Sequence, residues 1–163
     1  MHTCILVKEE TPPQGLLCIM HRLREVLSRV TLVTYSQVVL TSGQASALYE
    51  VNNPPDVIKC ETVVRMAGIS LFLIKITAVN GQEDLVAQVA RLRGSNIDPK
   101  LCEPGTLRRI VYDYVTDLHP DWQGSISLEG GLTYYLNFVH VPQDEKELAV
   151  CDKIFCKYLG NGS

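Results

Sequence analysis

Hydrophobic residues recur at helical spacing in the segment that follows Pro12 and Pro13. From Gln14 onward the apolar positions lie three or four residues apart, and most charged side chains fall between them. The apolar positions are Leu16, Leu17, Met20, Leu23, Leu27 and Val30. This pattern predicts an amphipathic helix with one face on a hydrophobic core.

Three segments rich in β-branched residues are predicted to be strands. The first is residues 3–8, and the second is residues 31–40, which end at a turn. Residues 69–81 are apolar on both faces as far as Ile74, which is typical of a central strand. Residues 46–66 mix short apolar pieces around the sequence NNPP, and we interpret them as two short strands joined by a loop.

Helices are predicted in three places in the second half of the chain. A short one begins near Leu85 and ends near Gly94. The next follows Thr106, a good N-terminal cap, and stops before Pro120, which disfavours helix in the preceding residue. The last covers residues 144–159 and stops at Gly160.

A hairpin is predicted around the two glycines at 130 and 131. A three-residue loop, 129–131, pairs Leu128 with Leu132 and Ile126 with Tyr134, and it collects the apolar side chains on one face. The opposite face then carries Tyr135 and Val139 toward solvent. Together with Trp122 at a loop end, these residues are the predicted interface: Tyr135, Val139 and Trp122.

Nothing divides the chain, since it contains no repeat and no linker rich in serine and glycine. We predict a single α+β domain over residues 1–160, with a mixed or mostly antiparallel sheet and about four helices packed on it. Residues 161–163 are predicted to be a short disordered tail. Strands and helices do not alternate regularly enough for a doubly wound sheet.

The composition is that of an ordinary globular protein, with 46% hydrophobic residues, 20% charged residues and a net charge of -3. The first ten residues do not resemble a signal peptide, and no apolar run is long enough to cross a bilayer. The six cysteines are therefore expected to be free thiols in a reducing compartment. We expect an intracellular protein, cytoplasmic or nuclear, of eukaryotic or viral type, with no membrane partner and not secreted.

Few residues are candidates for chemistry. Cys151 and Cys156 would point about 140° apart on a helix, so Cys151 is interpreted as a packing residue. Asp117, His119 and Asp121 alternate and would share one side of an extended segment, but the end of a helix is the simpler interpretation. The histidine at position 140 is interpreted as structural. Familiar catalytic motifs are absent, and we expect no metal site and no cofactor.

Four arginines are the candidate contacts for nucleic acid. If two neighbouring helices place them side by side, they form one basic patch on an acidic protein. They are Arg91, Arg93, Arg108 and Arg109.

The absence of catalytic motifs favours a non-catalytic protein-interaction module, an adaptor or complex subunit that binds another protein or its own copy. One alternative is a nucleic-acid-binding protein that uses the arginine patch. The other is an enzyme with a site around Asp117, His119 and Asp121, and the sequence leaves the question of catalysis open.

Overall fold

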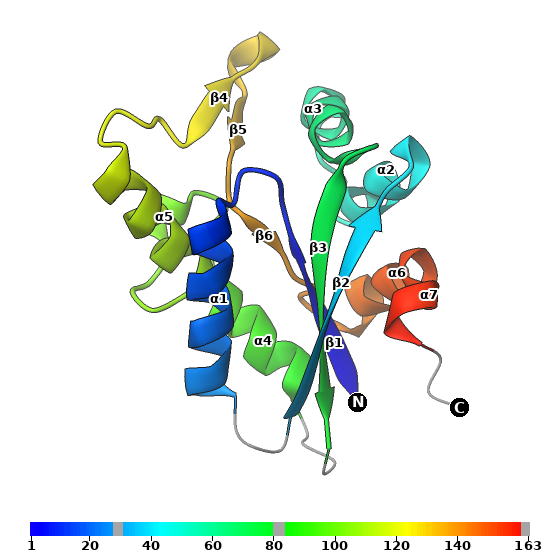
Figure 1. Cartoon of the computed structure of the whole chain (residues 1–163). Coiled ribbons are helices and arrows are strands. Elements are labelled where there is room, and N and C mark those ends of the chain that lie inside the picture. The colour runs from blue at the N-terminus through cyan, green and yellow to red at the C-terminus, as the bar shows by residue number, and fades with distance from the viewer. Residues whose placement is uncertain (28–30, 80–83, 161–163) are drawn as a thin grey trace.

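A four-stranded antiparallel sheet forms the centre of the molecule (Figure 1). The computed structural model describes residues 1–27, 31–79 and 84–160. The strand order is β2-β3-β1-β6. The strands are β1 (His2–Val7), β2 (Thr31–Val39), β3 (Ser70–Ala78) and β6 (Val139–His140). A separate hairpin consists of β4 (Ser125–Ser127) and β5 (Thr133–Tyr135).

Helices cover both faces of the sheet. They are α1 (Pro13–Val26), α2 (Ser42–Glu50), α3 (Asp56–Met66), α4 (Leu85–Arg93), α5 (Leu107–Leu118), α6 (Glu145–Ile154) and α7 (Cys156–Leu159). Two short 3-10 turns, η1 (Pro99–Leu101) and η2 (Glu129–Gly131), complete the described elements. The prediction of a single α+β domain with a mostly antiparallel sheet is confirmed, although the described residues contain seven α-helices instead of about four.

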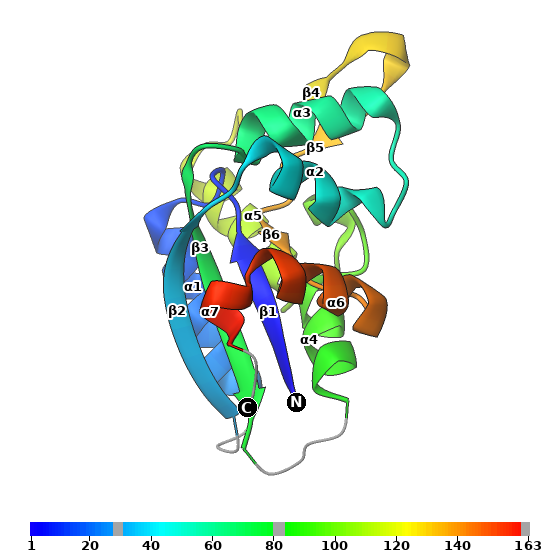
Figure 2. The ribbon, with the colours of Figure 1, turned by 90° about the vertical axis from the view of Figure 1, so that its right-hand side faces the viewer.

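The alternation of side chains along β1 creates two hydrophobic cores. Ile5 and Val7 face one core, which they share with α1, α4 and α5. Cys4 and Leu6 face the other core, beneath α2, α3, α6 and α7. Figures 1 and 2 show these two helical layers on either side of the sheet.

Elements with strong local signals form where the sequence predicts them. The first helix, the central strand and the helix before Pro120 are all present, although Val30 lies outside the described residues. The helix that follows Thr106 begins as predicted, but the threonine hydroxyl donates a hydrogen bond to the Glu103 carbonyl instead of capping it. The hairpin has the predicted register, with Ile126 opposite Tyr134, and both loop glycines have positive φ.

The prediction of two strands in residues 46–66 is wrong, because this segment forms α2 and α3. The Thr41 side chain accepts from the Gln44 amide while the Gln44 side chain accepts from the Thr41 amide, and this capping box starts α2. Helix α3 begins directly after Pro54 and Pro55. The predicted last helix is divided at Phe155 into α6 and α7, and the predicted tail lies outside the described residues.

The structure separates the three predicted interface residues. Val139 is fully buried where β6 pairs with β1, so the expectation that it faces solvent is wrong. Tyr135 is partly exposed, and Trp122 stacks on Phe138 with ring centroids 5.5 Å apart. An interface role for Tyr135 and Trp122 stays a prediction. Within the described part of the chain, no helix has the length and apolar character needed to span a membrane.

Candidate functional site

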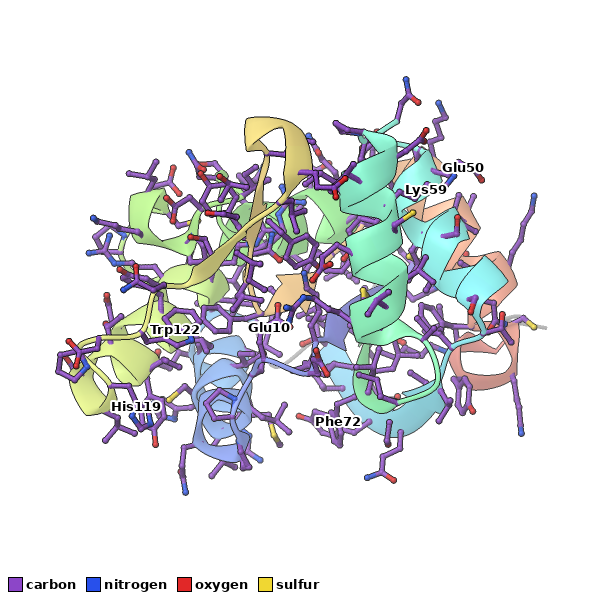
Figure 3. All side chains as sticks on the ribbon, turned by 90° about the horizontal axis from the view of Figure 1, so that it is seen from above. Glu10, Glu50, Lys59, Phe72, His119 and Trp122 are labelled. Atoms are coloured by element: carbon purple, nitrogen blue, oxygen red, sulfur yellow. The ribbon has the colours of Figure 1, made fainter. Side chains whose placement is uncertain are left out.

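A cavity of about 510 Å³ lies between α3 and the β4–β5 hairpin, above the end of β1. Its wall combines Lys8, which follows β1, with residues from α2, α3, β5, β6 and α6 and from the ends of α4 and α5. In the view from above, Glu10 lies near the centre of the molecule, between the layers of helices, whereas His119 and Trp122 lie to one side (Figure 3). Segments far apart in sequence therefore meet here.

Three cationic side chains line this cavity: Lys8, Arg93 and Arg108. Lys8 and Arg108 are buried, with relative exposures of 4% and 7%. Two carboxylates, Glu10 and Glu147, are close by, so the positive charges outnumber the negative ones. A concentration of buried cations that are not fully neutralised is expected to attract an anionic ligand.

Arg108, near the start of α5, is held by backbone carbonyls. Its Nη1 donates to the Asn96 carbonyl at 2.7 Å and its Nη2 to the Val139 carbonyl at 3.4 Å. Its buried Nε has no hydrogen-bond partner among the described residues. Burial, reinforced by the charge of Arg93, lowers the pKa of Arg108 to about 10. The guanidinium is therefore fixed in place and retains an unused donor.

Arg93 occupies the end of α4, where the chain turns sharply at Gly94. Its guanidinium donates to the carbonyls of Gly94 and Val141, and burial lowers its pKa. Gly94 has φ 113°, and a Cβ atom built there would lie 2.7 Å from the Cys102 sulfur. This close approach requires glycine and sets the direction in which the end of α4 points.

Lys8 connects the end of β1 to the segment before β6. Its Nζ donates to Asn137 Oδ1 at 2.7 Å and lies 3.5 Å from Glu10 Oε1. Glu10 also accepts from the backbone amide of Phe138 at 3.2 Å. These contacts fix the ammonium group, which has donors to spare for a ligand.

The backbone is strained at Phe138, which has φ 69° although it is not glycine. The Val139 amide donates to the Asn137 carbonyl across it at 2.8 Å, which makes a three-residue γ-turn. Such a conformation costs about 1–3 kcal/mol and is concentrated at functional sites. The fully buried Phe138 ring, stacked on Trp122, holds the turn in place.

His140 follows this strained turn on β6 and lines the cavity with a relative exposure of 8%. Its ring lies 5.0 Å from the ring of Tyr49, and the two planes make an angle of 54°. Burial, with a contribution from the Glu10 charge, raises the pKa of Tyr49. His140 thus places an imidazole, a nucleophile and hydrogen-bonding group, among the cationic side chains.

The outer part of the cavity is more apolar and aromatic. Tyr134 of β5 is buried, and this burial raises its pKa. The Lys8 ammonium lies 5.8 Å from the Tyr134 ring centroid and the Arg65 guanidinium carbon 5.5 Å from it. Pro54, Pro55, Ile58 and Leu132 also line this part. A flat ring can pack against such a surface while charged groups reach inward.

The sequence-predicted arginine patch is not present as a single surface. Arg93 and Arg108 turn into the cavity, whereas Arg91 is exposed and Arg109 pairs with Asp113 at 2.9 Å. The nucleic-acid alternative assumed that the four arginines form one patch. This assumption is wrong, because two of the four arginines line the cavity.

The structure does not bring Asp117, His119 and Asp121 into a described cavity. All three residues are exposed at the end of α5. No group of three or more potential metal ligands occurs in the described ranges. None of the six cysteines forms a disulfide bond. Cys151 is buried and Cys156 is exposed, in agreement with the interpretation of Cys151 as a packing residue.

Sequence reasoning noticed His140 but did not connect it with its partners. The sequence shows Asn137 and His140 three residues apart, with Phe138 between them. It also shows Arg108 shortly after the sequence EPGT, and Lys8 at the end of a predicted strand. No sequence distance links these positions, so the cavity itself was needed to connect them.

Several solved structures resemble the chain along most of its length. Nucleoside diphosphate kinase from Encephalitozoon cuniculi has a TM-score of 0.65 and 16% identity, with 98% of this chain and 89% of that chain covered. A transition state mimic of nucleoside-diphosphate kinase from Borrelia burgdorferi, with bound vanadate and ADP, has a TM-score of 0.63 and 16% identity, with 95% and 86% covered. The chain has the fold of nucleoside diphosphate kinases.

A third similar structure is the halophilic nucleoside diphosphate kinase from Halobacterium salinarum in complex with CDP, with a TM-score of 0.61 and 16% identity. The similarity covers 99% of this chain and 88% of the Halobacterium salinarum chain. No family model and no curated protein matches the sequence.

These likenesses contradict the prediction of a non-catalytic adaptor or complex subunit. That prediction depended on the absence of familiar motifs, but the fold is one in which enzymes occur, and its cavity contains a histidine among cations. A site assembled from distant residues leaves no short motif in the sequence.

Proposed function

We propose that the protein is a phosphotransferase that moves a terminal phosphoryl group between nucleotides through His140. The observation that carries this proposal is the position of His140 in the wall of a cavity that also contains Lys8, Arg93 and Arg108. The similarity to structures with bound vanadate and ADP, and with CDP, supports a nucleotide as the ligand.

The chemistry follows from the side chains present. A neutral imidazole nitrogen has a lone pair that can attack the terminal phosphorus of a nucleoside triphosphate. The P–N bond forms as the P–O bond to the leaving diphosphate breaks, and the reverse reaction with a second diphosphate restores the histidine. The cationic side chains stabilise the negative charge of the transferred group and of the leaving diphosphate.

The two zones of the cavity match the two ends of a nucleotide. Phosphate groups would lie beside Arg108, whose Nε is without a partner among the described residues, and beside Lys8. The base would pack against the apolar outer zone near Ile58 and Tyr134.

The test is to capture the phosphorylated protein. Incubation with magnesium and ATP labelled in the terminal phosphate should give protein-bound label that is stable to alkali and labile to acid, and adding CDP should remove it. His140→Gln should abolish the label. His119→Gln, which changes an exposed histidine outside the cavity, should leave it unchanged. Unlabelled wild-type protein, or label that persists in His140→Gln, would refute the proposal.

We also propose that the chain associates with its own copy along β2. This nine-residue strand lies at the edge of the sheet, and it exposes Leu32, Tyr35 and Val39, with relative exposures of 57%, 38% and 60%. An exposed edge of this length is open to pairing with another strand. Two copies of one strand can pair antiparallel about a two-fold axis, which satisfies both edges equally.

A further inference from the structure

Two buried cysteines lie in the second hydrophobic core, near His140. Cys4 is on β1 and Cys151 is on α6, which packs against β1 in the second hydrophobic core. Each has a relative exposure of 1%. The pairing of β1 with β6 places His140 opposite Leu6, on the face of the sheet that Cys4 also occupies. The side chains of Cys4, Cys151 and His140 therefore lie where β1, β6 and α6 meet.

The three side chains belong to one buried group. Cys4 and Cys151 lie in the second core, and Tyr49, whose ring centroid is 5.0 Å from that of His140, packs against the same core. Cys4 and, to a smaller extent, His140 lower the pKa of Cys151, as expected for groups close to its sulfur. The His140 ring therefore has the Cys151 sulfur and the Tyr49 ring as neighbours.

A carboxylate on the same helix, which also lines the cavity, has partners of its own. Glu147 lies one turn before Cys151, and its Oε2 accepts from the Gln143 amide at 3.0 Å. Its own amide donates to the Asp144 side chain. One oxygen of this carboxylate thus stabilises the start of α6.

We propose that Cys151, supported by Cys4, is a positioning residue for His140 in the reaction. The inference rests on the proposed function. The ring nitrogen that attacks phosphorus must carry a lone pair, so the proton of a neutral imidazole must be on the other nitrogen. A hydrogen bond from that N–H to the Cys151 sulfur fixes both the tautomer and the orientation of the ring.

The proton balance of the step is simple. The attacking nitrogen gains the phosphoryl group, the bond to the diphosphate breaks, and the proton on the second nitrogen stays in place beside the sulfur. The ring becomes more positive as the P–N bond forms, so the hydrogen bond to a polarisable sulfur accepting from it strengthens.

Buried cysteines commonly act only as small apolar residues, so the experiment must separate positioning from packing. It compares Cys151→Ala, Cys151→Ser and the control Cys156→Ala, which changes an exposed thiol on α7. Two quantities are measured: the ring nitrogen chemical shifts of His140, without nucleotide, and the single-turnover rate of His140 phosphorylation by magnesium and ATP.

The wild-type protein should show one His140 tautomer, and Cys151→Ala should show a mixture of two. The phosphorylation rate of Cys151→Ala should fall about threefold to tenfold, as expected for the loss of one hydrogen bond. Cys151→Ser, whose hydroxyl can also accept, should restore the single tautomer and most of the rate, and Cys156→Ala should behave as wild type.

Identical nitrogen spectra in wild type and Cys151→Ala would overturn the proposal, whatever the rates. If Cys151→Ala does not fold, Cys151→Ser decides: a mixture of tautomers in that variant counts against positioning, and the wild-type spectrum supports it. If wild-type His140 is not phosphorylated at all, the proposed function fails, while the nitrogen spectra still report whether Cys151 orients the ring.

Discussion

Replacing Arg108 with methionine removes a buried charge but keeps a long side chain of similar reach. Burial and the charge of Arg93 lower the pKa of Arg108 from its ordinary value to about 10, which corresponds to about 3 kcal/mol of unfavourable free energy for the charged form in the folded protein. The variant loses the hydrogen bonds to the Asn96 and Val139 carbonyls, of which the shorter, charged one contributes about 1.5–3 kcal/mol. The gain from removing an unfavourable buried charge and the loss of these hydrogen bonds nearly cancel. The free energy of unfolding of the variant should therefore stay within about 1.5 kcal/mol of wild type.

The sign of the pH dependence fixes the conditions of the measurement. Because the folded pKa of Arg108 is below its unfolded value, the unfolded state binds more protons above about pH 10. The destabilising effect is therefore fully present below pH 10 and is relieved as the pH rises above it. Tyr49 acts in the opposite direction, since its raised pKa makes the unfolded state ionise first. Urea denaturation at about pH 8 avoids both transitions.

The stabilisation of the protein by bound nucleotide should change far more than its stability without nucleotide. ADP at about 100 times its dissociation constant should stabilise the wild-type protein by about 2.7 kcal/mol. At the same ADP concentration, Arg108→Met should lose most of this effect, because a charge-assisted contact with phosphate is missing. The matched control is Arg109→Met, the next residue on α5, which pairs with Asp113 at the surface and should keep the full response.

Two results would refute this reasoning about Arg108. A loss of 3 kcal/mol or more in Arg108→Met without ligand would show that the guanidinium is mainly structural. An unchanged stabilisation by ADP in the variant would show that no phosphate group lies against Arg108.

The hairpin and the edge strand give two further predictions. Tyr134→Ala should lower the free energy of unfolding by about 3 kcal/mol because the ring is buried, whereas Tyr135→Ala should change it little; equal losses in urea denaturation would contradict the assigned roles, and light scattering would show whether Tyr135 also contributes to self-association. Leu32→Glu at the edge of the sheet should reduce the molar mass measured by light scattering, whereas Val64→Glu, which changes another exposed apolar residue on α3, should not. The same mass for wild type and both variants would exclude association along β2.

Several elements were determined by the sequence alone, because their signals act over a few neighbouring residues. The spacing of apolar residues predicts α1, and Pro120 ends α5 by disfavouring helix in the residue before it. The two hairpin glycines allow the positive φ angles that set the register of β4 and β5. Each of these signals acts before distant parts of the chain come into contact.

Local preference misled the interpretation of residues 46–66. Their β-branched residues favour strands, yet the capping box at Thr41 and the start of α3 after Pro55 give two helices whose inner side chains, such as Leu48 and Met66, are buried in the second core. The capping box was visible in the sequence as Thr41 followed by Gln44. The burial that stabilises these helices was not, because it depends on the face of β1 beneath them.

Only the tertiary structure decided the candidate site. Lys8 follows β1, Arg108 belongs to α5 and His140 to β6, and the antiparallel pairing of β1 with β6 brings the first and last of these together. Cys151 was correctly assigned to a buried helical face, but its contact with His140 depends on how α6 packs on the sheet. Helical periodicity determines which side of a helix is buried, whereas the partner of a buried atom is determined by the packing of segments that are distant in sequence.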